Sequence, residues 1–456
     1  METKFDLIET PGGVDLAASF ANTHVADIVE ALNALPDETG ADVLAGLPLD
    51  RATEVLDQPG LENPSEIVKL LPEDRAVELL EAMSADRCAD MFRELSEPPR
   101  TRLLARLSPE VQAVVRQLLV YPEGSAGAIM TTEFVSVLST ATVSQTLHYI
   151  RVVERTRETV YSIYVLDSQT HRLLTAVTLR QLIAGAPDDP ILSVAPQRLV
   201  VTADPLMDQE DVARLIGKYD LLAVPVVDEK DHVLGIVTVD DVLDAMVAEN
   251  TEDAQKFGGT EPLDEPYMDI GFIDMLRKRA GWLCILFLAE MLTAWAMQYF
   301  QAELEKAIVL ALFIPLVMSS GGNSGSQATS LIIRALALRE IRLRDWWRVA
   351  LRELPTGAVL GAILGVIAVV RIAVWQWLGL FDYGVHWPRI ALAIGCALVG
   401  IVTFGSLSGS MLPFILKRIG FDPASASAPF VATLVDVSGL VIYFSVALVF
   451  LKGTLL

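Results

Sequence analysis

Five long apolar stretches in the C-terminal part constrain the fold of this chain more than any other feature. Each approaches or exceeds the roughly 20 apolar residues that an α-helix needs to cross the hydrocarbon core of a bilayer. Because lipid offers no hydrogen-bond partner to an open backbone, we expect five transmembrane helices in an all-α membrane domain over 276–456. The stretches cover about 280–300, 307–336, 354–378, 389–416 and 425–451.

Charge is divided unevenly between this apolar part and the rest. Residues 276–456 hold 15 Lys and Arg against 9 Asp and Glu, a balance of +6, whereas residues 1–275 hold 20 against 49, a balance of −29. So acidic a soluble part is a poor partner for nucleic acid and a good one for cations. The three cysteines show no metal-ligand spacing and no disulfide framework, and we expect no cleaved signal peptide.

The connectors between the apolar stretches predict the orientation in the membrane. Basic residues gather before the first stretch, between the second and third, and between the fourth and fifth. Positive residues favour the cytoplasmic side, so we expect an inner-membrane protein in contact with lipid, with its N-terminus in the cytoplasm and its C-terminus outside. The basic residues are Arg277, Lys278, Arg279, Arg339, Arg342, Arg344, Arg348, Arg352, Lys417 and Arg418.

Residues 1–125 are predicted to form an all-α, solenoid-like domain. Apolar residues recur there at helical spacing, and helix-start signals such as LPED at 71–74 and LSPE at 107–110 separate the runs. Repeated punctuation of this kind indicates stacked short helices. A glycine-bearing connector, YPEGSAGAIMTT, follows at 121–132.

Two similar α/β units are expected at 126–195 and 196–248. Thr178 and Thr238 lie 60 residues apart, and each unit reads strand, turn, strand, helix. This spacing indicates an internal duplication. The pair either binds a ligand or serves as a dimerising scaffold without one.

The segment 249–275 is expected to begin as a helix and to connect the soluble part to the membrane domain. Glu249, Glu252 and Asp253 share one helical face, where like charges destabilise the helix by a few tenths of a kcal/mol. Either a divalent cation or plain solvation would relieve this repulsion.

One acid, Asp436, lies near the middle of the last apolar stretch. A carboxylate at that depth is costly and marks a candidate functional site, unless hydroxyls such as those of Thr433 and Ser438 satisfy it. The second stretch contains GGNSGSQ at 321–327, which we expect to form a loop buried in protein or lining water.

The oxygen atoms of these two stretches favour a hard cation. Gly321 and Gly322 would let another backbone or an ion approach closely, and Asn323 offers a neutral carbonyl oxygen. Oxygen ligands suit Mg²⁺ or Ca²⁺ rather than Zn²⁺. One carboxylate cannot strip Mg²⁺ of its waters, but Asp436 could hold a hydrated ion through those waters. Two chains would place two such acids around one axis, which favours a dimeric pore.

Two other functions are compatible with the pattern. Glu290 in the first stretch could pair with Asp436 as an intramembrane protease dyad, although the Gly-x-Gly-Asp setting of such enzymes is absent from the sequence. The chain could also be a membrane-tethered nucleotide sensor in which the apolar stretches only anchor. Ion transport is the leading hypothesis, and it makes the chain a transporter rather than an enzyme.

The second α/β unit, with AVPVVD and GIVTVDD, resembles a CBS domain, and the two units resemble a CBS tandem. In that family the Gly235-x-x-Thr238-x-x-Asp241 pattern faces phosphate and ribose, which implies Asp241 as a nucleotide contact and ATP as a possible ligand. The first unit has Arg180-Gln181 at the corresponding place.

The whole chain resembles the MgtE family of magnesium channels and transporters. The resemblance rests on SAGAIMT, GGNSGSQATSLIIRALAL, LRDWWRV and FDPASASAPFVATLVDVSGLVIYFSV, and on the order helical N domain, CBS tandem, linker helix, five spans. It implies a homodimer whose pore is lined by spans two and five, with Asp436 as the ion-selecting carboxylate. It also implies that Mg²⁺ bound by the acidic cytoplasmic part and the linker ("plug") helix closes the pore. The implied regulatory ligands are Glu54, Asp86, Asp90, Asp208, Glu210, Asp220, Asp241, Asp244, Glu249, Glu252, Asp253 and Asp422.

Overall fold

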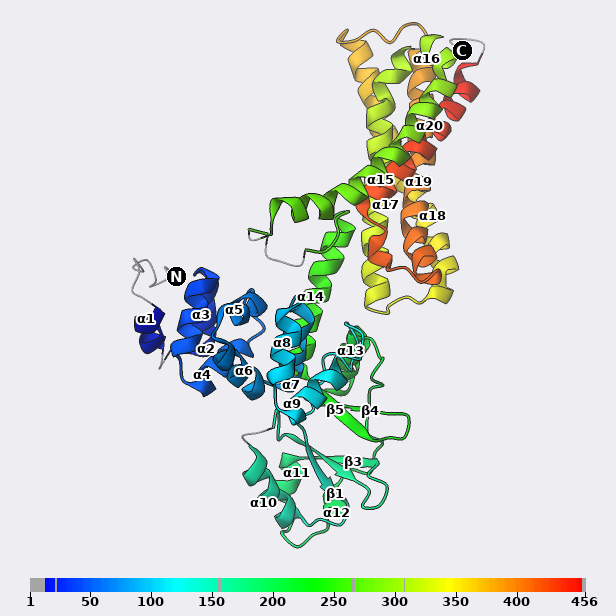
Figure 1. The fold of residues 1–456 in the computed structure, drawn as a ribbon. Coiled ribbons are helices and arrows are strands. Elements are labelled where there is room, and N and C mark those ends of the chain that lie inside the picture. Colours follow the sequence, from blue (N-terminus) through cyan, green and yellow to red (C-terminus); the bar gives the residue numbers. More distant parts are fainter. Residues whose placement is uncertain are drawn as a thin grey trace. The chain divides into compact units, whose positions relative to one another are not determined.

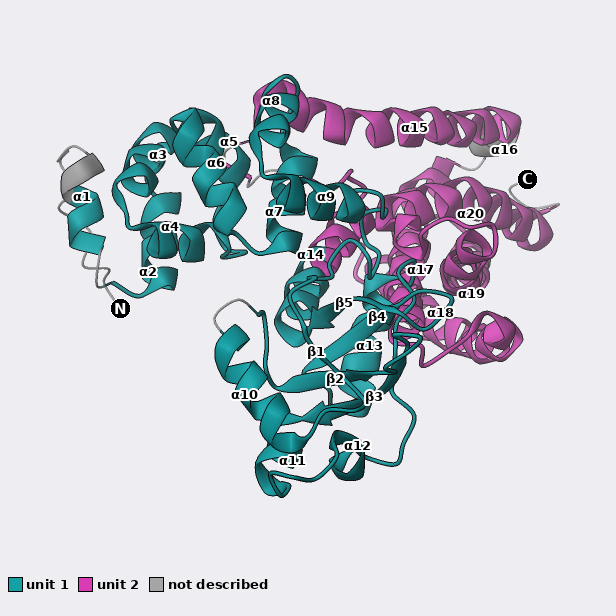
Figure 2. Cartoon of the chain, turned by 60° about the horizontal axis from the view of Figure 1, so that its bottom comes forward, with its two compact units in different colours: residues 1–248 teal, residues 249–456 magenta. Residues whose placement is uncertain are grey.

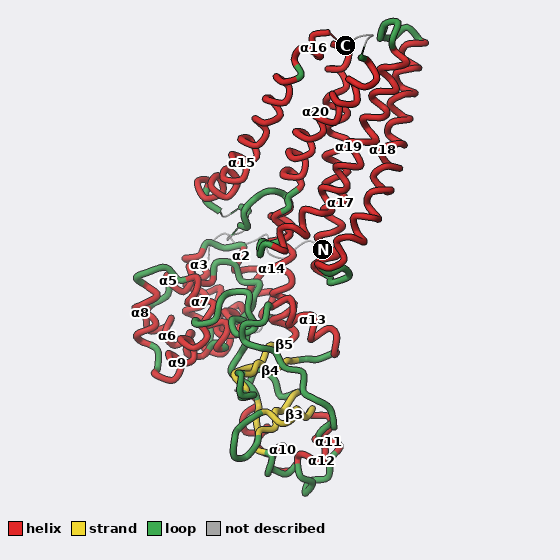
Figure 3. The backbone as a smooth tube through the Cα atoms, turned by 90° about the vertical axis from the view of Figure 1, so that its right-hand side faces the viewer, coloured by secondary structure: helices red, strands yellow, loops and turns green. Residues whose placement is uncertain are grey.

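The chain is described by a computed structural model that covers residues 13–20, 23–154, 157–263, 267–268, 270–306 and 308–452. It divides into two compact units, Met1–Ala248 and Glu249–Leu456 (Figure 2). The predicted fold class is confirmed: a helical N-terminal part, an α/β part with small sheets, and a helical C-terminal part (Figure 3).

The helical N-terminal part is a stack of short helices in which each packs against the helix two places along the chain (Figure 1). Most of these helices begin directly after a proline or serine, as the punctuation of the sequence predicts. One continuous apolar core runs through the stack. The helices are α1 (Gly13–Phe20), α2 (Val25–Asn33), α3 (Asp37–Gly46), α4 (Leu49–Leu56), α5 (Pro64–Leu70), α6 (Glu73–Ala82), α7 (Ala85–Glu94), α8 (Pro99–Arg106) and α9 (Pro109–Leu118).

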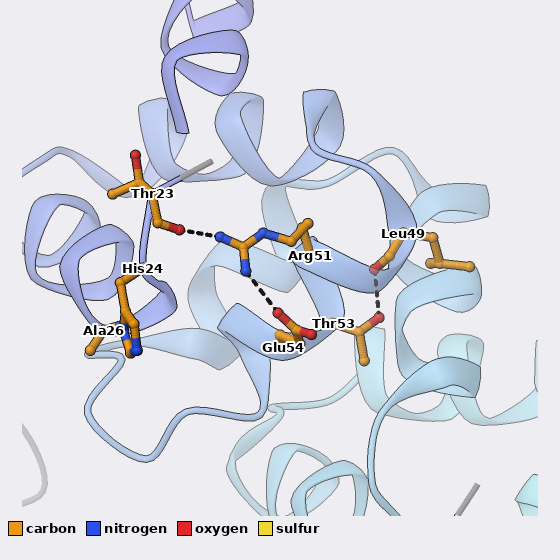
Figure 4. A network of polar contacts seen from close by, with 7 residues as sticks. All are labelled: Thr23, His24, Ala26, Leu49, Arg51, Thr53 and Glu54. Carbon is orange, nitrogen blue, oxygen red and sulfur yellow. Dashed lines mark hydrogen bonds and ion pairs between the residues drawn. The ribbon is translucent and has the colours of Figure 1, made fainter. Parts of the chain in front are cut away.

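Arginines tie successive layers of the stack together. Arg51 pairs with Glu54 at 2.9 Å and donates to the backbone carbonyl of Thr23 (Figure 4). Arg75 repeats the arrangement one layer on, since it pairs with Glu78 and donates to a carbonyl 28 residues earlier in the chain. Both guanidiniums therefore satisfy carbonyls at helix ends while lying along the core.

The two α/β units share one strand pattern, as the duplication predicts. In the first, β1 (Val135–Leu138) runs parallel to β2 (Ser162–Leu166), which pairs with antiparallel β3 (Leu173–Thr178). In the second, β4 (Ala223–Val227) pairs with antiparallel β5 (Val233–Thr238), and an isolated parallel bridge at Ala203 takes the place of β1. The helices are α10 (Val143–Val153), α11 (Leu179–Ala184), α12 (Ile191–Val194), α13 (Gln209–Tyr219) and α14 (Val239–Phe257).

The connector at 121–132 pairs with the second α/β unit. Thr131 and Ile236 exchange backbone hydrogen bonds at 2.9 Å, and a Cβ on Gly235 would lie 2.6 Å from the Thr131 carbonyl oxygen. Glycine is therefore required at 235 by the close approach of another strand. Helices α7 and α9 share a buried core with this second unit, so both belong to the same compact body.

The described residues of the C-terminal unit form five helices that are long and apolar enough to cross a membrane, as predicted. The longest antiparallel contact is between α18 and α19, and α17 and α20 pack against α19 and against each other. Helix α18 begins eight residues before the predicted third stretch and continues through Pro355, because the preceding polar residues already have helical backbone. The elements are α15 (Phe272–Tyr299), α16 (Gln301–Lys306), η2 (Ile308–Phe313), α17 (Ile314–Ala337), η3 (Leu343–Asp345), α18 (Trp346–Trp377), α19 (Trp387–Arg418), η4 (Pro423–Ser425) and α20 (Ala428–Leu451).

The loop predicted at GGNSGSQ was wrong, since residues 321–327 lie inside the continuous helix α17. A Cβ on Gly405 would lie 2.4 Å from the Gly321 carbonyl oxygen, and one on Gly409 would lie 2.1 Å from the Gly325 carbonyl oxygen. The glycines therefore let two helical backbones touch, and this packing offsets their low helix propensity. Gly357, Gly361 and Gly365 recur every four residues and bring α18 against α19, where an added Cβ would lie 2.6–2.8 Å from backbone atoms.

Candidate ion pathway and cation-binding sites

Asp436 is half-buried on α20, and within the described part of the chain it forms no hydrogen bond or ion pair. The Thr433 hydroxyl donates instead to the Pro429 carbonyl of its own helix at 3.0 Å. Hydroxyls therefore do not satisfy Asp436. Glu290 of α15, the helix packed beside α20, lies close enough for the two carboxylates to repel each other. Two acids at membrane depth, neither with a basic partner among the residues that the structure describes, leave a place for a cation.

Helix α17 carries the other predicted pathway residues, and Gly322 lies on its side next to α20. Gly322 contacts Ala432, which lies one turn before Asp436 on the same face of α20. Asn323 is exposed, and its amide nitrogen lies 3.4 Å from the Ser319 hydroxyl. Gly321 is buried against α19 and Val435, so of the two predicted roles for this glycine the structure shows the approach of another backbone.

A cluster of acids surrounds Asp86 of α7 and Asp241 of α14, together with Asp57 at the end of α4 and Glu158 before β2, and we name these four residues the acid cluster. Burial raises the pKa of Asp86 to about 6, and the neighbouring Asp90 and Asp57 charges also act to raise it. Burial and the Asp86 charge raise the pKa of Asp241 to about 7. The same two causes raise the pKa of Glu158 to about 7, and burial raises that of Asp57 to about 6. Four carboxylates thus resist ionisation together.

Arg87 faces this cluster. Its guanidinium donates to Asp244 at 2.9 Å, and Asp86 and Asp241 hold its pKa above the usual value despite its burial. The Oδ1 atom of Asp86 is buried without a hydrogen-bond partner within the described part of the chain, in a side chain only 6% exposed. An orphaned carboxylate oxygen among like charges fits a further cation.

The acid cluster suits a hydrated ion better than a bare one. No group of three or more His, Cys, Asp or Glu side chains among the described residues is arranged to hold a metal ion directly. Mg²⁺ dehydrates reluctantly and is commonly held by one or two carboxylates and several waters. The four acids offer carboxylate oxygens, the ligands that Mg²⁺ prefers.

The remaining predicted ligands of the first unit lie elsewhere. Asp208 caps α13 and accepts from the Glu210 amide at 2.9 Å, while Glu210 pairs with Arg214. Asp220 ends the same helix, so about 16 Å of helix separates it from the other two. Glu54 pairs with Arg51. Of the predicted set, the structure brings together Asp86, Asp90, Asp241 and Asp244 near Arg87, and Asp90 also pairs with Arg93.

In the second unit a lysine joins two of the predicted ligands. Lys256 pairs with Glu252 four residues before it and with Asp422 at 2.7 Å. Burial would lower the pKa of Lys256, but its hydrogen bonds to Asp422 and Glu252 raise it above the usual value. Asp422 also caps η4 by accepting from the Ala424 amide. Glu249 and Asp253 lie on the same helix, α14.

A cavity of about 820 Å³ lies between the α/β units. Arg180, Arg198 and Gln181 bring polar groups to it, and Tyr164 and Leu199 belong to its apolar wall. Asp241 does not line this cavity: as the third residue of α14 it accepts from the hydroxyl and backbone amide of Thr238. The Thr-x-x-Asp pattern thus caps a helix, and Gln181 forms the same box with Thr178 in the first unit.

Comparison with known proteins identifies the family. A model for the divalent cation transporter MgtE matches residues 314–446, one for the MgtE intracellular N domain matches 23–124, and one for the CBS domain matches 193–248. The magnesium transporter MgtE of Thermus thermophilus is 42% identical over 353 residues, covering 77% of this chain and 76% of that protein. The chain belongs to the MgtE family.

Other MgtE proteins are similar over comparable lengths. The magnesium transporter MgtE of Enterococcus faecalis is 36% identical over 338 residues, 74% of this chain and 72% of that protein. A crystal structure of the cytosolic domain of the Mg²⁺ channel MgtE in complex with ATP is 38% identical, with a TM-score of 0.47 over 50% of this chain and 93% of that one.

Several residues of this MgtE chain that build the sites were missed from the sequence. Arg87 and Asp57 sit in the helical stack, 154 and more residues from Asp241, and no local pattern links them. The Glu252–Lys256 spacing predicts their pair, but not the contact with Asp422, 166 residues later. Glu290 stands out in the sequence as an acid in an apolar stretch, but only the packing of α15 on α20 places it near Asp436.

Proposed function

We propose that this chain transports Mg²⁺ across the cell membrane through a pathway formed by two copies, with Asp436 holding the hydrated ion. The observation that carries the proposal is a membrane-depth carboxylate without a partner in the described chain, in a protein 42% identical to a magnesium transporter. Two copies around an axis would supply two carboxylates. Gly322, on the face of α17 next to Ala432 of α20, would give the ion space, and Asn323 of the same helix would offer its side-chain oxygen.

Flux into proteoliposomes tests this proposal. Asp436→Asn removes the charge and keeps the shape, so Mg²⁺ uptake should fall at least tenfold. Asp382→Asn is the matched control, because Asp382 lies in the loop after α18 and is held by Gln376 and the Gly384 amide. Unchanged uptake by the Asp436 variant, or an equal loss in both, would contradict the pore role.

We also propose that cytoplasmic Mg²⁺ closes this pathway by binding to the acidic part. The acid cluster supports the proposal, since its carboxylates repel each other at neutral pH and one Asp86 oxygen has no partner. Glu249, Asp253, Asp208, Glu210 and Asp220 are further proposed ligands. A chain lacking residues 1–250 should conduct at every cytoplasmic Mg²⁺ concentration. Inhibition that persists in that variant would refute the gate.

A second ligand, ATP, is proposed for the cavity between the α/β units. Arg180 and Arg198 can neutralise phosphate charge there, and Tyr164 and Leu199 give an apolar wall for a base. The test is equilibrium binding of labelled ATP to the full chain. Arg180→Ala should weaken it about tenfold, whereas Arg172→Ala on the β2–β3 turn should not.

Intramembrane proteolysis is the less favoured alternative. A dyad would require the carboxyl groups of Glu290 and Asp436 to share a proton, and no hydrogen bond joins them within the described part of the chain. Membership of a transporter family favours ion passage, and transport in the absence of any peptide substrate would separate the two.

A further inference from the structure

A second cavity, of about 520 Å³, opens at the end of the membrane helices that carries the basic connectors. It lies between the beginning of α18 and the last turns of α19, two helices packed along their length. Met411, Phe414 and Ile415 of α19 form an apolar side. Phe414 is only 5% exposed and belongs to a small buried cluster with α17, so this side is a rigid wall.

The rim of the cavity also carries cationic and aromatic side chains. Arg344 of η3 and Arg418 of the last turn of α19 both line it, and both side chains are exposed. Neither forms an ion pair within the described part of the chain, since the nearby Asp345 pairs with Arg348 and caps η3. Trp346, which is 47% exposed, stands beside them. Tryptophan at this position is typical of the membrane–water interface.

We propose that this cavity binds one acidic phospholipid. Its phosphate would lie between Arg344 and Arg418, and the acyl carbons nearest its glycerol would lie against Met411, Phe414 and Ile415. Two unpaired guanidiniums recognise a phosphate through forked hydrogen bonds. The adjoining wall is apolar. A free phosphate would gain nothing from such a wall, whereas a lipid acyl chain would pack against it. Basic pockets between membrane helices at the cytoplasmic end are typical acidic-lipid sites. This site is separate from the proposed ion pathway, and its failure would leave that pathway untouched.

Native mass spectrometry of the full chain in detergent tests the proposal, with dioleoyl phosphatidylglycerol and dioleoyl phosphatidylcholine as probes. The first phosphatidylglycerol should bind at least tenfold more tightly than phosphatidylcholine. Each arginine near an anionic headgroup strengthens binding roughly fivefold. The double variant Arg344→Gln with Arg418→Gln should therefore weaken phosphatidylglycerol about 25-fold. Arg352→Gln is the control, since Arg352 is exposed at the same end and does not line the cavity.

Each other outcome overturns the proposal. An equal loss in the Arg352 variant would mean general charge attraction. Soluble glycerol phosphate that displaces the lipid at equal concentration would mean an anion site without a lipid. Tighter lipid binding after removal of residues 1–250 would mean that an acidic segment of the chain occupies the cavity. Should the glutamine variants misfold, Met411→Trp offers a second test, because it keeps both arginines and places a larger side chain in the cavity. This variant must weaken phosphatidylglycerol binding more than tenfold.

Discussion

Neutralising Asp86 should stabilise the Mg²⁺-free cytoplasmic part. The native pKa of Asp86 is about 6, whereas its ordinary value, 3.8, applies to the unfolded chain. A tenfold change in the acid dissociation constant corresponds to about 1.4 kcal/mol, so ionising this carboxylate in the native state costs about 3 kcal/mol. Asp86→Asn removes that cost and should raise the free energy of unfolding by about 2–3 kcal/mol near neutral pH.

The pH dependence of this effect follows from the raised pKa. Between about pH 4 and pH 6 the native state holds a proton that the unfolded chain has released, so stability falls as pH rises through this window. Below about pH 4 both states are protonated, and the variant should gain nothing. The wild-type part should therefore be more stable near pH 5 than near pH 7.5, unless Mg²⁺ is added.

Thermal unfolding of residues 1–258, followed by circular dichroism, measures both effects. This fragment contains the first compact unit and the whole of α14. Near neutral pH the variant should melt roughly 5–10 °C higher than wild type without Mg²⁺. Millimolar Mg²⁺ should raise the melting temperature of wild type and leave that of the variant unchanged.

The matched control is Asp42→Asn, an exposed acid of α3 away from the cluster. Its melting temperature should change by little, and its response to Mg²⁺ should match that of wild type. If Asp86→Asn lowered the melting temperature near neutral pH, or kept the full Mg²⁺ response, the repulsion inferred for the acid cluster would be refuted.

Three further predictions concern the second unit and the acid cluster. Lys256→Gln removes the cation between Glu252 and Asp422, so amide hydrogen exchange of residues 249–263 should speed up by about tenfold and slow again when Mg²⁺ is added. Arg277→Gln, which breaks the exposed pair with Asp274, is the control. Gly409→Ala places a methyl 2.1 Å from a carbonyl oxygen and should cost about 3 kcal/mol or more, whereas Gly322→Ala, with 3.4 Å to Ala432, should be tolerated in a detergent melting assay. Glu158→Gln should lower the apparent Mg²⁺ affinity of the 1–258 fragment by titration calorimetry, and an unchanged affinity would remove Glu158 from the site.

The fold class could be predicted because its signals are local and repeated. Helix punctuation in the N-terminal part, the Thr178 and Thr238 duplication, and five apolar stretches each carry their own period. The loop predicted at GGNSGSQ was wrong for a physical reason. Glycine and serine favour loops in isolation, but here Gly321 and Gly325 pack against Gly405 and Gly409, 84 residues later.

The sites were only partly predictable because their partners come from distant segments. Asp436 stands out in the sequence, since a charge in an apolar run is rare. Nothing local to Asp86 or Asp241 indicates that α7 and α14 bring them together with Arg87 between them. Thr238 and Asp241 fit both a phosphate motif and a helix cap, and only the hydrogen bonds between them identify the cap.

The glycine contacts along α19 limit how the membrane domain can move. Backbones that touch at Gly321–Gly405, Gly325–Gly409 and Gly365–Gly395 leave no room for one helix to slide past the other, since a shift of one residue drives a side chain into a carbonyl. Helices α17, α18 and α19 therefore behave as one rigid body. Any widening of a passage beside Asp436 has to come from hinge motion of α20 and α15 against this rigid body, not from sliding of helices within it.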